Sequence, residues 1–140
     1  MLITPKLFKL NKFVNSTGTL LPITFDKKFP MSVKRVFFIY GKKKYIRGEH
    51  AHKKCEQFFY PVFGKFEITM KYRGKVQKIN LDHREKNGLY MPPAIWCNVR
   101  FKKKDSIILV LASHVYSFRD YIENYDDFLK YEKKLYTKNR

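Results

Sequence analysis

Two histidines, His50 and His52, are separated by one small residue, Ala51, in the middle of a β-rich chain. We predict a strand over residues 45–53, and alternate residues of a strand project from the same face. Both imidazoles are therefore expected to enter one cavity. An imidazole has a pKa near neutral pH, so such a pair can bind a metal ion or exchange protons with a substrate.

A metal site needs three or four protein donors, and the surrounding sequence does not supply them. Two histidines, a polar residue and a later glycine, here Gly64, are typical of the first half of a small β-barrel of the cupin class. The carboxylate position of that pattern falls near Glu56 or Gln57, and the spacing to Gly64 favours Gln57, a poor ligand. Cys97 stands where a further histidine ligand is expected. We therefore predict no metal and no other cofactor.

Without metal, the pair is predicted to serve as general base and general acid. The alternative is a structural role, in which two histidines fill a polar patch inside the barrel. Further candidates for the cavity lining are Arg35 and Tyr40 from the preceding strand, Arg47 and Gln57 beside the pair, and Trp96, Asn98 and Arg100 from one face of a later strand. Arginines bind phosphate oxygens and aromatic rings stack on bases, so this set suits a nucleotide-linked substrate. Trp96 in the core and Arg100 on the surface are the simpler alternatives.

Short segments of β-branched and aromatic residues, separated by turn signals, predict the strands that position these side chains. The predicted strands are residues 33–40, 45–53, 56–63, 65–72, 75–81, 89–91, 95–101 and 106–112. Residues 73–74 and 87–88 are predicted turns, and Pro61 is expected to interrupt its strand. Apolar residues at spacings of three and four over residues 120–136 predict a helix packed against the outside of the barrel. The fold class is all-β, a single cupin (jelly-roll) barrel with a short C-terminal helix, in one domain over residues 1–140.

The formal net charge is +18, from 30 Lys and Arg against 12 Asp and Glu. Such an excess attracts anionic partners, and a nucleotide diphosphate or nucleic acid would qualify. The lysine clusters at residues 42–44 and 102–104 are explained more simply as solvated turns. The two cysteines are not in a CxxC arrangement and fit a reducing cytoplasm. The longest aliphatic run, residues 107–112, is too short to cross a bilayer, so we expect a cytoplasmic protein without a membrane partner.

Several segments together resemble the dTDP-4-keto-6-deoxyglucose 3,4-ketoisomerases, which are small cupins. The matching segments are VKRVFF (33–38), RGEHAHK (47–53) with Gln57, GLY (88–90), PPAIW (92–96), VLAS (110–113) with Tyr116, and DYI (120–122) with Tyr125 and Phe128. Two positions depart from the family pattern. Cys97 replaces a histidine that often follows the tryptophan, and Thr17 replaces an arginine that commonly precedes the glycine of an N-terminal turn.

The resemblance implies a metal-free isomerase that converts the 4-keto form of a dTDP-6-deoxyhexose into its 3-keto form, for a 3-amino-3,6-dideoxy sugar of surface glycans such as lipopolysaccharide O-antigen. It also implies a homodimer with exchanged N-terminal strands. On this basis His50 is assigned as the base, His52 as the second proton carrier and Tyr40 as a helper near the oxygens. Candidates for the diphosphate or enediolate are Arg35, Arg47 and Arg100, with Trp96 and Asn98 lining the sugar or base pocket. A non-catalytic module that binds a nucleotide sugar or nucleic acid, and a 3,5-epimerase, remain alternatives, although a nucleic-acid partner is disfavoured.

Overall fold

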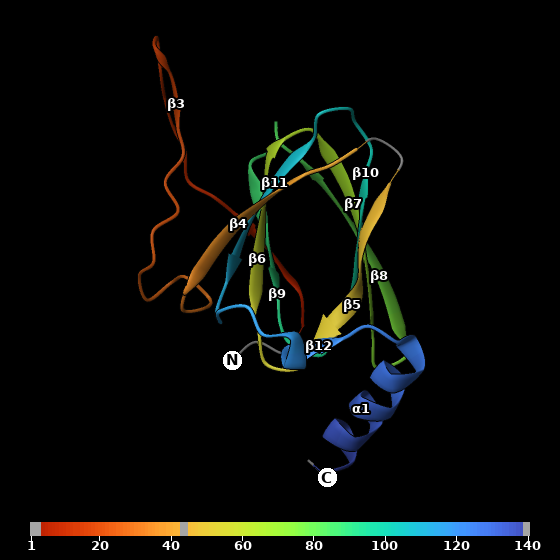
Figure 1. Cartoon of the computed structure of the whole chain (residues 1–140). Coiled ribbons are helices and arrows are strands. Elements are labelled where there is room, and N and C mark those ends of the chain that lie inside the picture. Colours follow the sequence, from red (N-terminus) through yellow and green to blue (C-terminus); the bar gives the residue numbers. More distant parts are fainter. Residues whose placement is uncertain (1–3, 43–44, 139–140) are drawn as a thin grey trace.

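The computed structural model describes residues 4–42 and 45–138, and Figure 1 shows the whole chain. Two lysines of the cluster at 42–44 thus lie outside the described residues. The elements are β1 (Lys6–Lys9), β2 (Phe13–Asn15), β3 (Gly18–Leu20), β4 (Arg35–Tyr40), β5 (Ile46–His52), β6 (Gln57–Phe63), β7 (Lys65–Tyr72), β8 (Lys75–Asp82), β9 (Asn87–Met91), β10 (Trp96–Phe101), β11 (Ile107–Ala112), the 3₁₀ helix η1 (Phe118–Asp120), β12 (Tyr121–Ile122) and α1 (Tyr125–Thr137).

Two five-stranded antiparallel sheets face each other and form the barrel (Figure 1). One sheet has the strand order β1-β9-β6-β11-β4 and the other has the order β12-β5-β10-β7-β8. Neighbours in a sheet are mostly distant in sequence, as in a jelly roll, where long connections carry the chain between the two sheets. The predicted all-β barrel with a C-terminal helix is confirmed.

The main hydrophobic core fills the space between the two sheets. In β7, Phe66, Ile68, Met70 and Tyr72 are buried and alternate with more exposed residues, as the sequence pattern predicted. They pack with apolar residues of both sheets, including the fully buried Val110 of β11. Alternate residues of a strand face opposite sides of its sheet, so this core also determines which side chains can reach the cavity.

The N-terminal segment covers the outer face of the first sheet. Its apolar side chains pack with Phe58 and Tyr90, which project from the side of that sheet opposite the main core. The hairpin β2–β3 extends away from the barrel (Figure 1), and all of its residues are exposed. The strand β1 pairs with β9 of the same chain. The strands β2 and β3 pair with each other, and neither pairs with a described strand of the two sheets.

The C-terminal helix α1 packs on the outside of the second sheet, as predicted. It begins at Tyr125 and not at residue 120, because residues 120–122 form the end of η1 and the strand β12. Asn124 caps its N-terminus, because the side-chain oxygen accepts a hydrogen bond from the backbone N–H of Asp127. Phe128 is buried with Trp96 and Ala51 in a small apolar cluster. None of the helices in the described part of the chain has the length and apolar character needed to cross a membrane.

Two details of the predicted strands are wrong. Asn87 and Gly88 do not form a turn; they are the first residues of β9 and pair with β1. The turn lies earlier, because the backbone of Lys86 adopts a left-handed φ of 57°. Pro61 does not interrupt β6, since the strand runs through it. Pairing with β9 ends at Phe59, two residues before Pro61. Proline has no backbone N–H, but on the β9 side no hydrogen bond between strands is needed at this position.

Gly88 leaves room for the buried ring of Phe58, since a Cβ atom at residue 88 would overlap that ring. We therefore expect Gly88→Ala to lower the free energy of unfolding by about 1–3 kcal/mol, the usual cost of overpacking. Gly74→Asn is the control, because a Cβ there meets nothing within 4 Å and asparagine tolerates the left-handed φ of 73°. Urea denaturation of the three proteins measures the difference, and equal midpoints would contradict the packing argument.

Candidate active site

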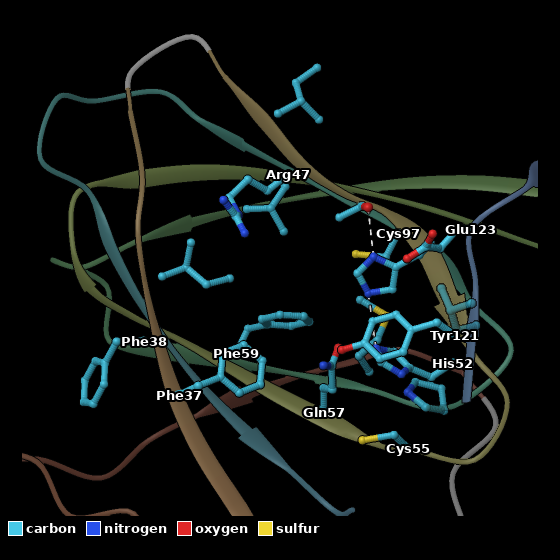
Figure 2. Close-up of a pocket in the computed structure, with 18 of the residues that line it drawn as sticks. Phe37, Phe38, Arg47, His52, Cys55, Gln57, Phe59, Cys97, Tyr121 and Glu123 are labelled. Carbon is cyan, nitrogen blue, oxygen red and sulfur yellow. Dashed lines mark hydrogen bonds between the residues drawn. The ribbon is translucent and has the colours of Figure 1, made fainter. Parts of the chain in front are cut away.

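A cavity of about 740 Å³ lies between the two sheets and extends along β4 and β5 as far as β12. It is lined by Phe37, Phe38, Ile39, Tyr40, Ile46, Arg47, Gly48, His50, His52, Cys55, Gln57, Phe59, Met91, Pro92, Ile95, Cys97, Val99, Tyr121 and Glu123. Figure 2 shows Phe37, Phe38 and Phe59 at one side of the cavity, and His52, Tyr121 and Glu123 at the other. An arrangement of this kind can hold a ligand with an apolar surface and a reacting polar end.

His50 is positioned by an irregularity in β5. The pairing of β5 with β10 shifts register, so Cys97 faces His50 and the next residue of β10 faces Gly48, which leaves Glu49 as the extra residue of a bulge. Gly48 and Glu49 both have positive φ values, 96° and 49°. The bulge turns the carbonyl of Gly48 toward the imidazole, whose Nδ1 lies 2.8 Å from that oxygen. Because a carbonyl only accepts, Nδ1 of His50 carries the hydrogen.

His52 is positioned by a carboxylate from the far end of the sequence. Its Nδ1 lies 3.0 Å from Oδ2 of Asp120, the last residue of η1. The same carboxylate accepts hydrogen bonds from the backbone N–H groups of Lys54 and Cys55. β12 continues directly from η1 and pairs with β5, so Tyr121 faces His52. This short pairing fixes the carboxylate at the end of the histidine strand.

The two imidazoles face each other inside the cavity. Their Nε2 atoms are 3.2 Å apart and the ring planes are nearly perpendicular. Tyr121 covers both rings, with ring centroids 4.9 Å from His50 and 4.4 Å from His52. Figure 2 shows the hydroxyl of Tyr121 directed into the cavity on the side of Gln57. The Nε2 atoms of two imidazoles and a phenol therefore lie close together, a set suited to moving protons between neighbouring atoms of a ligand.

Burial controls the protonation of this cluster. The pKa of His52 is lowered to about 4, chiefly by burial and then by the nearby charge of a protonated His50, against the opposing effect of Asp120. Burial acts to raise the pKa of Asp120, but hydrogen bonds from Lys54, His52 and Cys55 outweigh it and hold that pKa below its usual value. His52 is thus neutral and Asp120 ionised near pH 7.

Of the predicted site residues, His50, His52, Arg47 and Gln57 line the same cavity. Arg35 lies beside it, with its guanidinium over the rings of Phe37 and Tyr116. Its Nε is buried and has no hydrogen-bond partner, and its charge is close enough to lower the pKa of His52. Arg35 is therefore a half-buried cation that can meet an anionic group of a ligand.

Four other placements need correction. Tyr40 borders the cavity, but its side chain is 74% exposed and lies on the outer face of β4, because it is five residues from Arg35 and an odd spacing reverses the face. Trp96, Asn98 and Arg100 do share one face of β10, but Cys97 and Val99 hold the face toward the cavity. Trp96 packs instead on Tyr125 and Phe128 of α1, and Arg100 is exposed.

Three site residues were missed as functional groups, namely Asp120, Tyr121 and Glu123. Asp120 and Tyr121 belong to a segment that matched the family pattern, yet nothing in the residues themselves connected them with histidines about 70 positions earlier. Cys97 was recognised only as an absent ligand. The structure places its thiol on the cavity wall, where burial raises its pKa to about 12, so the thiol is neutral.

One group of side chains could hold a cation. Ligand atoms of His52, Cys55 and Asp120 lie within 4.8 Å of one another. Each of these groups already forms a hydrogen bond. Both oxygens of Asp120 accept N–H hydrogen bonds, one of which comes from His52. The thiol of Cys55 donates to the carbonyl of Glu56 at 3.4 Å. A metal would have to replace these bonds, so the donor set fits a hydrogen-bonded carboxylate better than a metal centre.

The lowered pKa of His52 predicts a pH-dependent stability. Between about pH 6.5 and about 4 the unfolded chain binds a proton at residue 52 that the folded protein does not, so the free energy of unfolding falls as the pH is lowered through this range. His52→Gln removes this contribution, and its stability should decline less steeply than that of the wild type. Thermal unfolding at a series of pH values gives both slopes. Above pH 7 the slopes should coincide, and parallel curves throughout would show that His52 titrates normally.

Comparison with known proteins assigns the family. A sequence profile described as FdtA: WxcM-like, C-terminal, matches residues 4–133. A curated relative, TDP-4-oxo-6-deoxy-alpha-D-glucose-3,4-oxoisomerase of Aneurinibacillus thermoaerophilus, is 37% identical over 131 residues, which are 93% of this chain and 94% of the relative.

Solved structures agree with this assignment. QdtA, a sugar 3,4-ketoisomerase of Thermoanaerobacterium thermosaccharolyticum in complex with TDP, superposes with a TM-score of 0.88 at 33% identity, over 96% of this chain and 98% of that one. A His-to-Asn variant of QdtA in complex with TDP-4-keto-6-deoxyglucose superposes equally well, at 32% identity over 96% of this chain and 97% of that one. An epimerase of Mycobacterium tuberculosis, with a TM-score of 0.76 at 15% identity over 84% of this chain and 66% of that one, shares the fold alone. The chain belongs to the FdtA family, whose similar members named here are TDP-sugar 3,4-ketoisomerases.

Proposed function

We propose that this chain is a TDP-sugar 3,4-ketoisomerase that converts dTDP-4-keto-6-deoxyglucose into a dTDP-3-keto-6-deoxyhexose. The observation that carries the proposal is the pair of imidazoles whose Nε2 atoms face each other at 3.2 Å inside the cavity. Relatives that cover nearly the whole chain bear this activity in their names. The epimerase alternative has only a likeness of fold in its favour.

The reaction moves two hydrogens between neighbouring carbons and their oxygens. A base removes the proton on C3, which is acidic because it lies beside the C4 ketone, and the C–H electrons form a C3–C4 double bond. The C4 oxygen takes up a proton, which gives an enediol. The C3 hydroxyl then loses its proton, the C3 ketone forms, and C4 receives a proton. C4 is reduced and C3 oxidised, so no external oxidant or reductant takes part.

We assign the removal of the C3 proton to His50 and the second proton-handling role to His52. Each ring keeps its Nδ1 bonded to a protein acceptor, so only Nε2 is free for the substrate. Tyr121 takes the helper role that the sequence suggested for Tyr40, because its ring contacts both imidazoles while Tyr40 faces outward. A phenol here can donate a hydrogen bond to the developing oxyanion.

The remaining cavity residues suit a substrate with a sugar and a diphosphate. Arg47 on the wall and Arg35 beside it supply the cations for the diphosphate or the enediolate. Gln57 is almost fully buried and offers both a donor and an acceptor to sugar hydroxyls. Trp96, Asn98 and Arg100 have no part in this proposal, because their face of β10 points away from the cavity.

Two wider expectations belong to the same proposal. A homodimer is supported by the exposed hairpin β2–β3, which presents Phe13, Val14 and Leu20 to solvent and could pack against a second subunit. The exchanged element would then be this hairpin, since β1 is already paired within the chain. The cytoplasm is supported by two free cysteines, Cys55 and Cys97. The product would supply an aminotransferase that makes a 3-amino-3,6-dideoxy sugar for a surface glycan.

The first test concerns turnover. Incubation of the protein with dTDP-4-keto-6-deoxyglucose in heavy water should give a 3-keto product with deuterium bound to carbon, detected by NMR. His50→Asn should lower the rate by about 10²–10⁴, the usual loss when a general base is removed, with TDP binding nearly unchanged. His83→Asn is the matched control, because that ring packs on Phe63, which lies outside the cavity lining. If the wild type yields no 3-keto sugar, the proposed function is wrong.

The second test concerns the diphosphate contact. Arg47→Ala should raise the KM for the TDP-sugar about tenfold or more, because a hydrogen bond to a charged group contributes about 1.5–3 kcal/mol. Arg100→Ala removes the same charge from the outer face of the neighbouring strand and should leave KM unchanged. Steady-state kinetics of both variants measure the effect. Equal effects would indicate that net charge, and not a contact in the cavity, determines affinity.

A further inference from the structure

We propose that Asp120 is a positioning residue that keeps the hydrogen of His52 on Nδ1, so that the two imidazoles hold one proton between their Nε2 atoms. The catalytic consequence rests on the proposed function, whereas the protonation state can be measured without substrate.

The carboxylate of Asp120 can act only as an acceptor. Its Oδ1 receives the backbone N–H of Lys54 at 2.8 Å, and its Oδ2 receives the backbone N–H of Cys55 at 3.2 Å. The backbone carbonyl of Asp120 also accepts the N–H of Lys53 at 2.9 Å, so the residue is tied to the end of β5 at several points. An ionised acceptor held in this way requires that Nδ1 of His52, 3.0 Å from Oδ2, carries its hydrogen.

The same reasoning applies to His50. Its Nδ1 lies 2.8 Å from the carbonyl oxygen of Gly48, which likewise can only accept. In the neutral form of each ring the Nε2 atom is therefore a bare acceptor. Two bare acceptors at 3.2 Å repel each other, whereas one proton between them makes a hydrogen bond. The geometry thus matches a pair that carries a single proton.

The surroundings oppose a second proton. Burial, the charge of a protonated His50 and the charge of Arg35 on β4 all act against a cation on His52. Other titratable groups also surround the pair: Tyr121 lies over both rings, Cys55 and Cys97 are on the cavity wall, and Arg47 and Glu123 are farther along the lining. Asp120 is the carboxylate in direct contact with the pair, and its hydrogen bond holds a proton on Nδ1 of His52. Its charge also raises the pKa of that ring, but burial and His50 lower the pKa by more.

A pair with one proton is suited to both halves of the ketoisomerase reaction. In the first half one Nε2 takes the C3 proton while the shared proton goes to the C4 oxygen. In the second half one Nε2 takes the proton of the C3 hydroxyl while the other gives a proton to C4. The pair holds one proton before and after each half. With no proton it could not donate, and with two it could not accept.

The experiment measures ring protonation in the ligand-free protein. Histidine labelled with ¹⁵N in the ring, followed by two-bond ¹H–¹⁵N correlation spectra over a pH series, distinguishes protonated from bare nitrogens. For His50 and His52 we expect hydrogens on both Nδ1 atoms and one further proton shared by the two Nε2 atoms. A wild-type spectrum with the hydrogen of His52 on Nε2 would overturn the proposal, even if no variant could be prepared.

Asp120→Asn tests the positioning role, because the amide of the variant can donate to Nδ1 and move the hydrogen of His52 to Nε2. We expect this change of tautomer in the spectra, a loss of kcat of about 10²–10⁴ with a small change in KM, and an altered pH profile. Asp82→Asn is the control, since that carboxylate accepts hydrogen bonds from Arg84 and lies outside the cavity lining. It should change neither the tautomer of His52 nor the rate.

The outcomes separate the two proposals. An unchanged tautomer and an unchanged pH profile in Asp120→Asn would show that Asp120 does not position His52. If the spectra agree with a shared proton but the wild type does not isomerise TDP-4-keto sugars, the proposed function fails while the assignment of the proton stands.

Discussion

The hydrogen bond between Asp120 and His52 is the contact on which the site depends. It joins residues 68 positions apart, and the same carboxylate accepts hydrogen bonds from the backbone N–H groups of Lys54 and Cys55, just after β5. Because a buried ionised group is costly unless it is fully hydrogen-bonded, these three N–H donors are what allows the carboxylate to remain charged there. Its charge in turn decides which nitrogen of His52 faces the second imidazole.

The fold holds this contact from both sides. β12 pairs with β5 and places Tyr121 over the imidazoles, while Ile122 packs with Trp96 and Phe128 beneath α1. The helix thus keeps the short edge strand in place without taking part in the chemistry itself. At the opposite side of the pair, the bulge in β5 directs the Gly48 carbonyl to His50, where a regular strand would direct it to a neighbouring strand.

Electrostatic balance at the site follows from burial. The protein has a formal net charge of +18, yet the charged group in direct contact with the histidines is the hydrogen-bonded carboxylate of Asp120. Arg35 has a buried Nε without a partner, held between the rings of Phe37 and Tyr116. A cation in that position can form a charge-assisted hydrogen bond with an anionic group of a ligand.

Most of the strands, the C-terminal helix and the family could be predicted from the residues, because each depends on local patterns. Alternation in β7 and the spacing of two between His50 and His52 are properties of one strand, and the structure agrees with both. Only the tertiary structure determined which residues from other strands contact the side chains of the site. Tyr40 points outward because an odd number of residues separates it from Arg35. Cys97 and Val99 face the cavity, so Trp96 and Arg100 on the opposite face of β10 do not line it. The segment before β12 lies beside the end of β5 and places Asp120 against His52. Such contacts arise from the pairing of strands that are distant in sequence, and a local pattern carries no information about the partner strand.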